Sequence, residues 1–117
     1  MFSALKSSGA FTNRLGDDIP AEIAPRDGEL VIAKHRVSAF SGNGLEMILR
    51  ANGTTELLLL GIATSGIVLS TARAAMDLDY EVAVVRDCCA DSDAEVHRVL
   101  CDKVFARHDK VIDSTEL

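Results

Sequence analysis

The sequence predicts an α/β fold with a parallel, Rossmann-like sheet in three layers. Two observations carry this prediction. Short apolar segments typical of strands alternate with segments of helical periodicity, and the connections between them are short. One apolar segment, Glu56–Ile62, is nearly free of polar residues, which is typical of a strand in the middle of a parallel sheet. The 117 residues are enough for one domain with a modest core.

The first part of the chain is its least regular part. Residues 1–29 contain several turn signals and are predicted to form an irregular N-terminal segment, whereas residues 30–117 are predicted to form the α/β domain. The first strand of this domain is expected at Leu30–His35, a short apolar run. A helix with an apolar face over Leu45–Leu49 follows and is expected to end at Asn52–Gly53.

The second half of the chain continues the alternation. Apolar residues lie nearly all round a predicted helix from Gly66 to Leu78, so this helix should be largely buried. A third strand is expected at Tyr80–Arg86, and a capping box at Ser92–Glu95 is expected to open the next helix. Lys110–Asp113 is interpreted as a last short strand.

The carboxyl ends of parallel strands are where such sheets bind ligands. The sequence predicts three of these ends, at Lys34–His35, at Ile62–Ser65 and at Asp87. The second is a turn of small residues that leads directly into a helix. Such a turn aims backbone N–H groups at one point, which suits an anion or an oxyanion. Its Thr64 and Ser65 are also good helix caps, and capping and ligand binding can coexist.

Composition excludes several classes of protein. The net charge is -6 and the basic residues are scattered, which argues against a nucleic-acid partner. No apolar run approaches the roughly 20 residues that span a bilayer, and the first nine residues lack the apolar core of a secretory signal. The protein is therefore expected to be cytoplasmic, with no membrane partner and no cofactor. Three cysteines argue against a disulfide framework.

The cysteines leave two interpretations open. Cys88 and Cys89 are interpreted as a buried pair of structural thiols, or else Cys88 stands near the pocket and acts as a nucleophile. His97 and Cys101 are spaced i, i+4 on one predicted helix and could hold a metal. Two ligands are too few, so we expect a solvated helix face there and no metal site.

Several segments, taken in order, resemble the isochorismatase-like cysteine hydrolases. They extend from about Leu30 to the end of the chain. The resemblance implies the fold of that family, a homo-oligomer, and hydrolysis of a small amide or vinyl-ether substrate. Family members use an Asp, a Lys and a Cys, with an oxyanion hole around a non-proline cis peptide. The segments are Leu30–Phe40, Leu45, Leu58–Thr64, Ser70–Ala75 and Glu81–Asp87.

Carried over residue by residue, the resemblance places the cis bond at Ile62–Ala63 and the oxyanion donors at the amides of Ala63 and Ile67. The family Cys falls on Ile67, and an aliphatic side chain cannot be a nucleophile. The same apolar replacement is seen in a subgroup that this chain resembles. The predicted site residues are Lys34 as a catalytic group, and Ala63, Ile67, Thr64, Ser65 and Phe40 as oxyanion- and substrate-binding groups.

The family's catalytic Asp follows a first strand, and no such strand is predicted before Leu30. The chain is therefore expected to lack the first two strands of the family sheet. The strand Glu56–Ile62 should then expose unpaired backbone and an apolar face, so that the chain alone would be unstable, rearranged or truncated.

Three functions follow as alternatives. The first is a hydrolase whose pocket works without the thiol. The second is a non-catalytic remnant that binds a small molecule or forms oligomers. The third is an enzyme with Ser65 or Ser70 as nucleophile, which requires His35 or His97 to lie close to it as a base.

Overall fold

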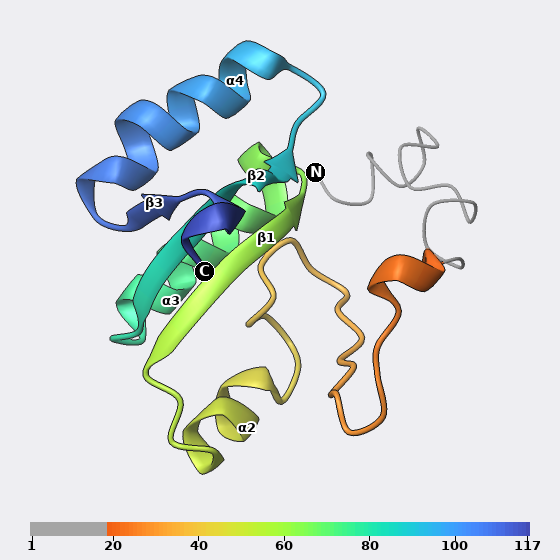
Figure 1. Ribbon diagram of the computed structural model, residues 1–117. Helices are drawn as coiled ribbons and strands as arrows, with labels where there is room; N and C mark the ends of the chain where they lie inside the picture. The colour runs from red at the N-terminus through yellow and green to blue at the C-terminus, as the bar shows by residue number, and fades with distance from the viewer. Residues whose placement is uncertain (1–18) are drawn as a thin grey trace. The chain divides into compact units, whose positions relative to one another are not determined.

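The structure, a computed structural model, describes residues 19–117 (Figure 1). Its backbone contacts divide the chain into two compact units, Met1–Ile32 and Ala33–Leu117. The described part of the first unit is exposed except for the half-buried Ile32, and it contains one 3-10 turn, η2 (Ala21–Ile23). The strand predicted at Leu30–His35 is wrong, because these residues have no regular secondary structure. Apolar composition alone does not make a strand; the backbone also needs a partner strand, and the described sheet provides none here.

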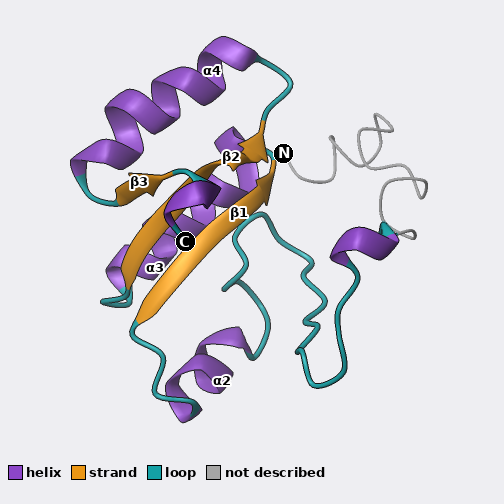
Figure 2. Ribbon diagram, viewed as in Figure 1, coloured by secondary structure: helices purple, strands orange, loops and turns teal. Residues whose placement is uncertain are grey.

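The second unit is built on a three-stranded parallel sheet, which confirms the predicted fold class (Figure 2). The strands are β1 (Glu56–Ile62), β2 (Glu81–Ala90) and β3 (Lys110–Ile112), in the order β1-β2-β3. Helices connect consecutive strands, as parallel pairing requires. All three strands lie where apolar runs predicted them, although β2 extends four residues past its predicted end.

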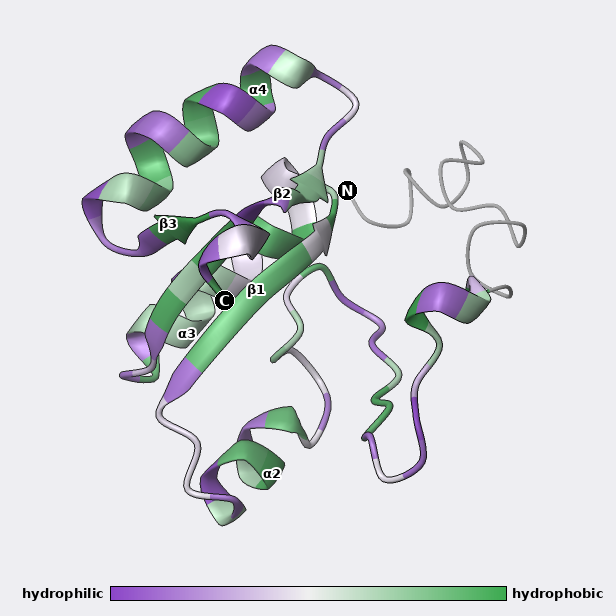
Figure 3. Ribbon diagram, viewed as in Figure 1, coloured by the Kyte–Doolittle hydropathy of each residue, from purple (hydrophilic) through white to green (hydrophobic). Residues whose placement is uncertain are grey.

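The position of β1 corrects one expectation and agrees with another. Its apolar pattern predicted a strand in the middle of the sheet, yet β1 is an edge strand that pairs only with β2 in the described sheet, with the unpaired edge and exposed apolar face that the resemblance led us to expect. Leu57 and Leu59 pack toward the core, whereas Leu58, Leu60 and Ile62 are 53%, 59% and 78% exposed. Figure 3 shows the apolar character running along β1. The sequence pattern thus correctly indicated that both faces of β1 are apolar. Only the face with Leu57 and Leu59 is covered by the core.

The helix before β1 is as predicted. It is α2 (Leu45–Ala51), and it ends at Asn52. Gly53 has a φ of +67°, a conformation that an L-residue adopts only with strain. The Gly53 amide donates to the Arg50 carbonyl at 3.0 Å, which satisfies a carbonyl of the last turn. The Asn–Gly signal therefore ends the helix for the reason that the sequence suggested.

The buried helix after β1 is also confirmed. It begins with a wide π-helical turn, η3 (Thr64–Val68), and continues as α3 (Leu69–Asp77). This helix lies behind the sheet in Figure 1. Ala72 and Ala75 are 2% and 0% exposed, because small side chains let the helix approach the strands closely. The buried residues of the core cluster are Val68, Ala72, Ala75, Tyr80, Val82, Val84, Cys89, Leu100, Cys101 and Phe105.

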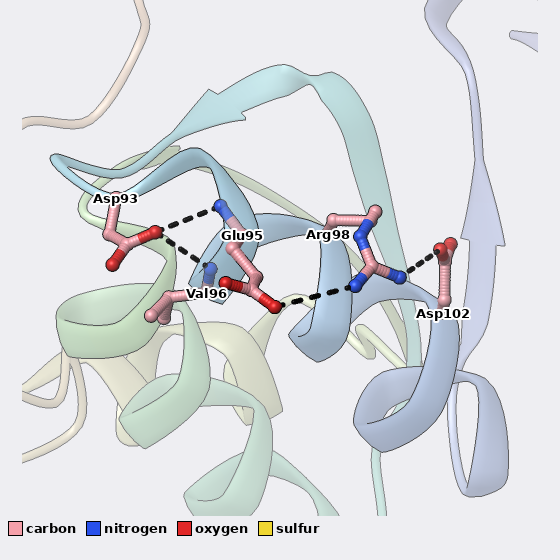
Figure 4. A network of polar contacts seen from close by, with 5 residues as sticks. All are labelled: Asp93, Glu95, Val96, Arg98 and Asp102. Atoms are coloured by element: carbon pink, nitrogen blue, oxygen red, sulfur yellow. Dashed lines mark hydrogen bonds and ion pairs between the residues drawn. The ribbon is translucent and has the colours of Figure 1, made fainter.

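The helix after β2 is formed by α4 (Ala94–Val99), η4 (Leu100–Val104) and the short 3-10 turn η5 (Phe105–Arg107). The predicted capping box at Ser92 is wrong, because the N-cap residue of α4 is Asp93. The Asp93 carboxylate accepts the amide hydrogens of Glu95 and Val96 at 2.9 and 3.3 Å (Figure 4). No described helix of this protein is both long enough and apolar enough to span a bilayer.

A bulge explains why β2 runs past its predicted end. Leu59 of β1 pairs with Val84, but Gly61, two residues later, pairs with Cys89. Three extra residues are therefore accommodated in β2 between two paired stretches, and the polar pair Arg86–Asp87 belongs to this interruption. The Asp87 carboxylate accepts the amide and the hydroxyl hydrogens of Ser114 at 2.8 and 2.5 Å. The charged residues thus interrupt the ladder without ending the strand.

Candidate functional site

The predicted site turn lies at the carboxyl end of β1. The peptide bond Ile62–Ala63 is cis, as the resemblance implied. The Ala63 carbonyl accepts the amide hydrogens of Gly66 and Val68 at 3.1 and 3.3 Å, so the chain turns tightly from the strand into η3. Four of the predicted site residues are therefore brought together on one turn, namely Ala63, Thr64, Ser65 and Ile67.

Asp91 holds this turn from the neighbouring strand. Its Oδ2 accepts the Ser65 amide hydrogen at 2.8 Å and the Ser65 hydroxyl hydrogen at 2.6 Å. These two hydrogen bonds, the hydroxyl first, lower the pKa of Asp91 to about 2. Its Oδ1 accepts the Asp93 amide hydrogen at 3.3 Å. Ser65 was predicted to bind the substrate. Its amide hydrogen, however, is already donated to the ionised carboxylate of Asp91.

Sequence reasoning missed the role of Asp91 because it ended β2 at Asp87. With β2 extended to Ala90, Asp91 is the first residue beyond the carboxyl end of the strand. The apolar residues Cys89 and Ala90 were the available signal, since they resume the strand pattern after the charged pair.

A second contact braces the same turn from α4. Thr64 is 0% exposed, and its Oγ1 lies 2.8 Å from Nδ1 of His97. The other ring nitrogen of His97, Nε2, lies 3.9 Å from Sγ of Cys101. The solvated helix face predicted for His97 and Cys101 is therefore wrong: His97 is half-buried and Cys101 is 1% exposed. A metal is not needed to explain their spacing, because Thr64 partners the imidazole.

These contacts bear on the serine alternative. The hydroxyl hydrogen of Ser65 is donated to Asp91, whereas the imidazole of His97 contacts Thr64. The hydroxyl that does lie beside an imidazole is fully buried, so a substrate carbonyl cannot reach it without a rearrangement. His35 is exposed on the irregular segment before α2. The described contacts thus bring neither histidine to Ser65.

Ile67 stands on the same turn with a different role. Its side chain is half-buried and packs against the hydrophobic core. This packing explains why an aliphatic side chain suits the position where the resemblance places the family thiol.

The other two predicted site residues lie elsewhere in the second unit. Lys34 is exposed on an irregular segment, and no described hydrogen bond or ion pair joins it to the turn. Phe40 stacks on Tyr80, with ring centroids 5.8 Å apart, and Tyr80 directly precedes β2. Phe40 therefore contacts the core near the amino end of β2. The site roles of Lys34 and Phe40 stay predictions.

The neighbouring cysteines differ in exposure. Cys89 is 9% exposed and belongs to the core cluster, whereas Cys88 is exposed. The predicted buried thiol pair is thus half right, because successive residues of a strand point to opposite faces. Burial raises the pKa values of Cys89 and Cys101, which keeps both as neutral thiols. Among the described residues, His, Cys, Asp and Glu side chains form no group of three or more placed to hold a metal.

The cations near the end of β2 are paired with carboxylates other than Asp91. Arg98 reaches Glu95 and Asp102, both at 3.9 Å (Figure 4). Arg86 also contacts Asp102, at 3.3 Å. Within residues 19–117, Asp91 has hydrogen-bond donors but makes no ion pair. Among the described residues, the Asp91 carboxylate is therefore held by hydrogen bonds and not by an ion pair.

Comparison with known proteins shows the family to which the chain belongs. The "Isochorismatase domain" family model matches residues 8–116. The uncharacterized isochorismatase family protein YecD of Escherichia coli O157:H7 is 33% identical over 84% of this chain and 52% of its own length. Maleamate amidohydrolase of Pseudomonas putida KT2440 is 31% identical over 77% of this chain and 42% of its own length.

Solved structures give the same result. The crystal structure of N-carbamoylsarcosine amidase from Thermoplasma acidophilum superposes with a TM-score of 0.80, at 30% identity, over 97% of this chain and 65% of that chain. The chain spans about half the length of the curated relatives it matches. Since the family model covers nearly the whole sequence, the chain belongs to the isochorismatase family of hydrolases.

Proposed function

We propose that this protein hydrolyses a small amide or vinyl-ether substrate at the turn Ala63–Ile67. The observation that carries the proposal is the bracing of this turn at the carboxyl end of β1, by Asp91 on Ser65 and by His97 on Thr64. A turn held on two sides can present backbone N–H groups to a developing oxyanion without reorganising. Two relatives are named as an amidohydrolase and an amidase, which favours an amide as the substrate.

The chemistry of this site would differ from a thiol mechanism. Ile67 has no atom that can attack a carbonyl carbon, so water is the proposed nucleophile. Water adds to the carbonyl, the amides of Ala63 and Ile67 stabilise the oxyanion, and the intermediate collapses to a carboxylic acid and ammonia. One such donor contributes about 3 kcal/mol to lowering a barrier in enzymes. Lys34 is the group that the resemblance assigns to polarising the substrate.

A second candidate function is binding without catalysis, in a protein that forms oligomers. The packing of Ile67 against the core favours it, because the position assigned to the nucleophile then serves stability alone. The exposed apolar side chains of β1 also favour association, since contiguous apolar surface tends to be buried in interfaces.

The test is a hydrolysis assay on the purified full chain. A panel of primary amides is followed by ammonia release, and a vinyl ether by release of its carbonyl product. Lys34→Met and Lys34→Arg form the matched pair, because the first removes the charge and the second keeps it. Turnover that falls at least tenfold in K34M but is retained in K34R supports the hydrolase. Turnover equal to a protein-free blank over the whole panel refutes it and leaves the binding function.

A further inference from the structure

The charge of Asp91 is a feature that the proposed chemistry does not use. The carboxylate is bonded to Ser65, and Ser65 lies two residues from Ala63 and two residues from Ile67. Two residues of a helix rise by about 3 Å, so the Ile67 amide lies within one turn of the Ser65 amide that donates to Asp91. The Asp91 charge is therefore close enough to act on a ligand at the turn.

The carboxylate is ionised under ordinary conditions. Its pKa is lowered to about 2 by the Ser65 hydrogen bonds, so it stays charged at neutral pH. The arginines nearest to it in sequence are paired elsewhere: Arg86 contacts Asp102. Arg98 contacts Glu95 and Asp102 (Figure 4). The hydrogen bonds to Asp91 fix the position of the charge but do not cancel it.

We propose that Asp91 determines the charge selectivity of this site, so that it favours uncharged carbonyl compounds and disfavours compounds with a carboxylate beside the carbonyl group. The inference deepens the proposed function and rests on the turn Ala63–Ile67 being the ligand site. For a ligand charge held about 8 Å from the carboxylate, repulsion between like charges at a protein surface is equivalent to a factor of about 2 to 30 in affinity. We expect discrimination of about tenfold at low salt.

The experiment compares two probes that differ in one group. Succinamide is neutral, and succinamate carries a carboxylate in place of one amide. Each is titrated into the full 15N-labelled chain at low salt, with the amide resonances of the turn as the readout of binding. The wild-type protein should bind succinamide about tenfold more tightly, and Asp91→Asn should reduce this ratio to about one. Asparagine keeps an oxygen that can accept the Ser65 amide hydrogen, so the turn retains a partner.

A control variant separates the charge of Asp91 from a general loss of negative charge. Asp87→Asn removes an equal charge that is held in the same way, by the amide and hydroxyl of Ser114, four residues earlier in β2. This variant should keep the wild-type ratio. A ratio that is unchanged in D91N, or equally reduced in D87N, overturns the proposal.

A test without any substitution guards against a misfolded variant. Raising the salt from 20 mM to 1 M should bring the wild-type ratio close to one, because the Debye length falls to about 3 Å. A ratio that does not respond to salt overturns the proposal, and so does the absence of any shift of the turn resonances with either probe. If the samples show selective binding but release no ammonia, the proposed hydrolysis is refuted while the charge selectivity is supported. Failure of one proposal can therefore be told apart from failure of the other.

Discussion

Thr64→Val tests whether the contact between the turn and α4 holds this part of the protein together. Valine has nearly the shape of threonine, so the substitution removes the hydroxyl with little change in packing. The hydroxyl is fully buried and lies 2.8 Å from Nδ1 of His97, which then loses its partner. An unsatisfied buried polar group costs about 1–3 kcal/mol. Because His97 is only half-buried, we expect about 1.5 kcal/mol, or about 6 °C in Tm for a chain of this size.

The assay is urea denaturation at one fixed pH, with the midpoint compared at a constant slope. His97→Leu provides the background for a double-mutant cycle, because Thr64→Val should cost little once the imidazole is gone. The coupling free energy should be about 1 kcal/mol. A Thr64→Val variant as stable as the wild type would refute the reasoning. An equal cost in both backgrounds would refute it as well, since the loss would then come from packing and not from the hydrogen bond.

Three further predictions concern the cap, the thiols and the acid response. Asp93→Ala should lower the free energy of unfolding by about 1 kcal/mol, measured by urea denaturation, whereas Ser92→Ala should be close to neutral; the reverse order would restore the Ser92 cap. A thiol reagent should react quickly with one cysteine of the native protein and with three after unfolding, and Cys88→Ser should remove the fast reaction; a fast reaction that persists would contradict the assigned burial. The pKa of Asp91 is lowered from 3.8 to about 2, so its stabilisation is complete above about pH 4 and is lost as the pH falls through about 2. Ser65→Ala should therefore lower Tm more at pH 5 than at pH 2, and a loss independent of pH would contradict this cause.

The strands and helices of the second unit were predictable because local pattern and burial agree there. β1 was predicted residue for residue, and the Asn52–Gly53 stop ends α2 as expected. The failure at Leu30–His35 has a physical reason: strand formation depends on a pairing partner that the local sequence does not encode. The apolar pattern of β1 wrongly predicted a middle strand for the same reason, since such a pattern reports what a face can bury and not what covers it; the exposed edge was expected only from the resemblance.

The candidate site was only partly predictable. The turn Ala63–Ile67 was found because small residues between a strand and a helix give a local signal. The two side chains that brace it, Asp91 and His97, lie 26 and 33 residues away from their partners in sequence. Their contacts depend on the register of β2 and on the packing of η3 against α4, which only the assembled fold determines. His97 was considered, but as a solvated residue, because helical spacing alone does not show which face is buried.

The three-residue bulge in β2 makes this segment sensitive to its length. Side chains alternate between the two faces of a strand, so an odd number of extra residues exchanges the faces. Before the bulge the even-numbered Val82 and Val84 enter the core, and after it the odd-numbered Cys89 does. Deleting or inserting one residue between Val85 and Cys88 would turn Cys89 outward and move Asp91 away from the Ser65 amide. Homologous sequences aligned to this protein with a one-residue gap there should therefore have lost both the thiol packing and the brace on the turn.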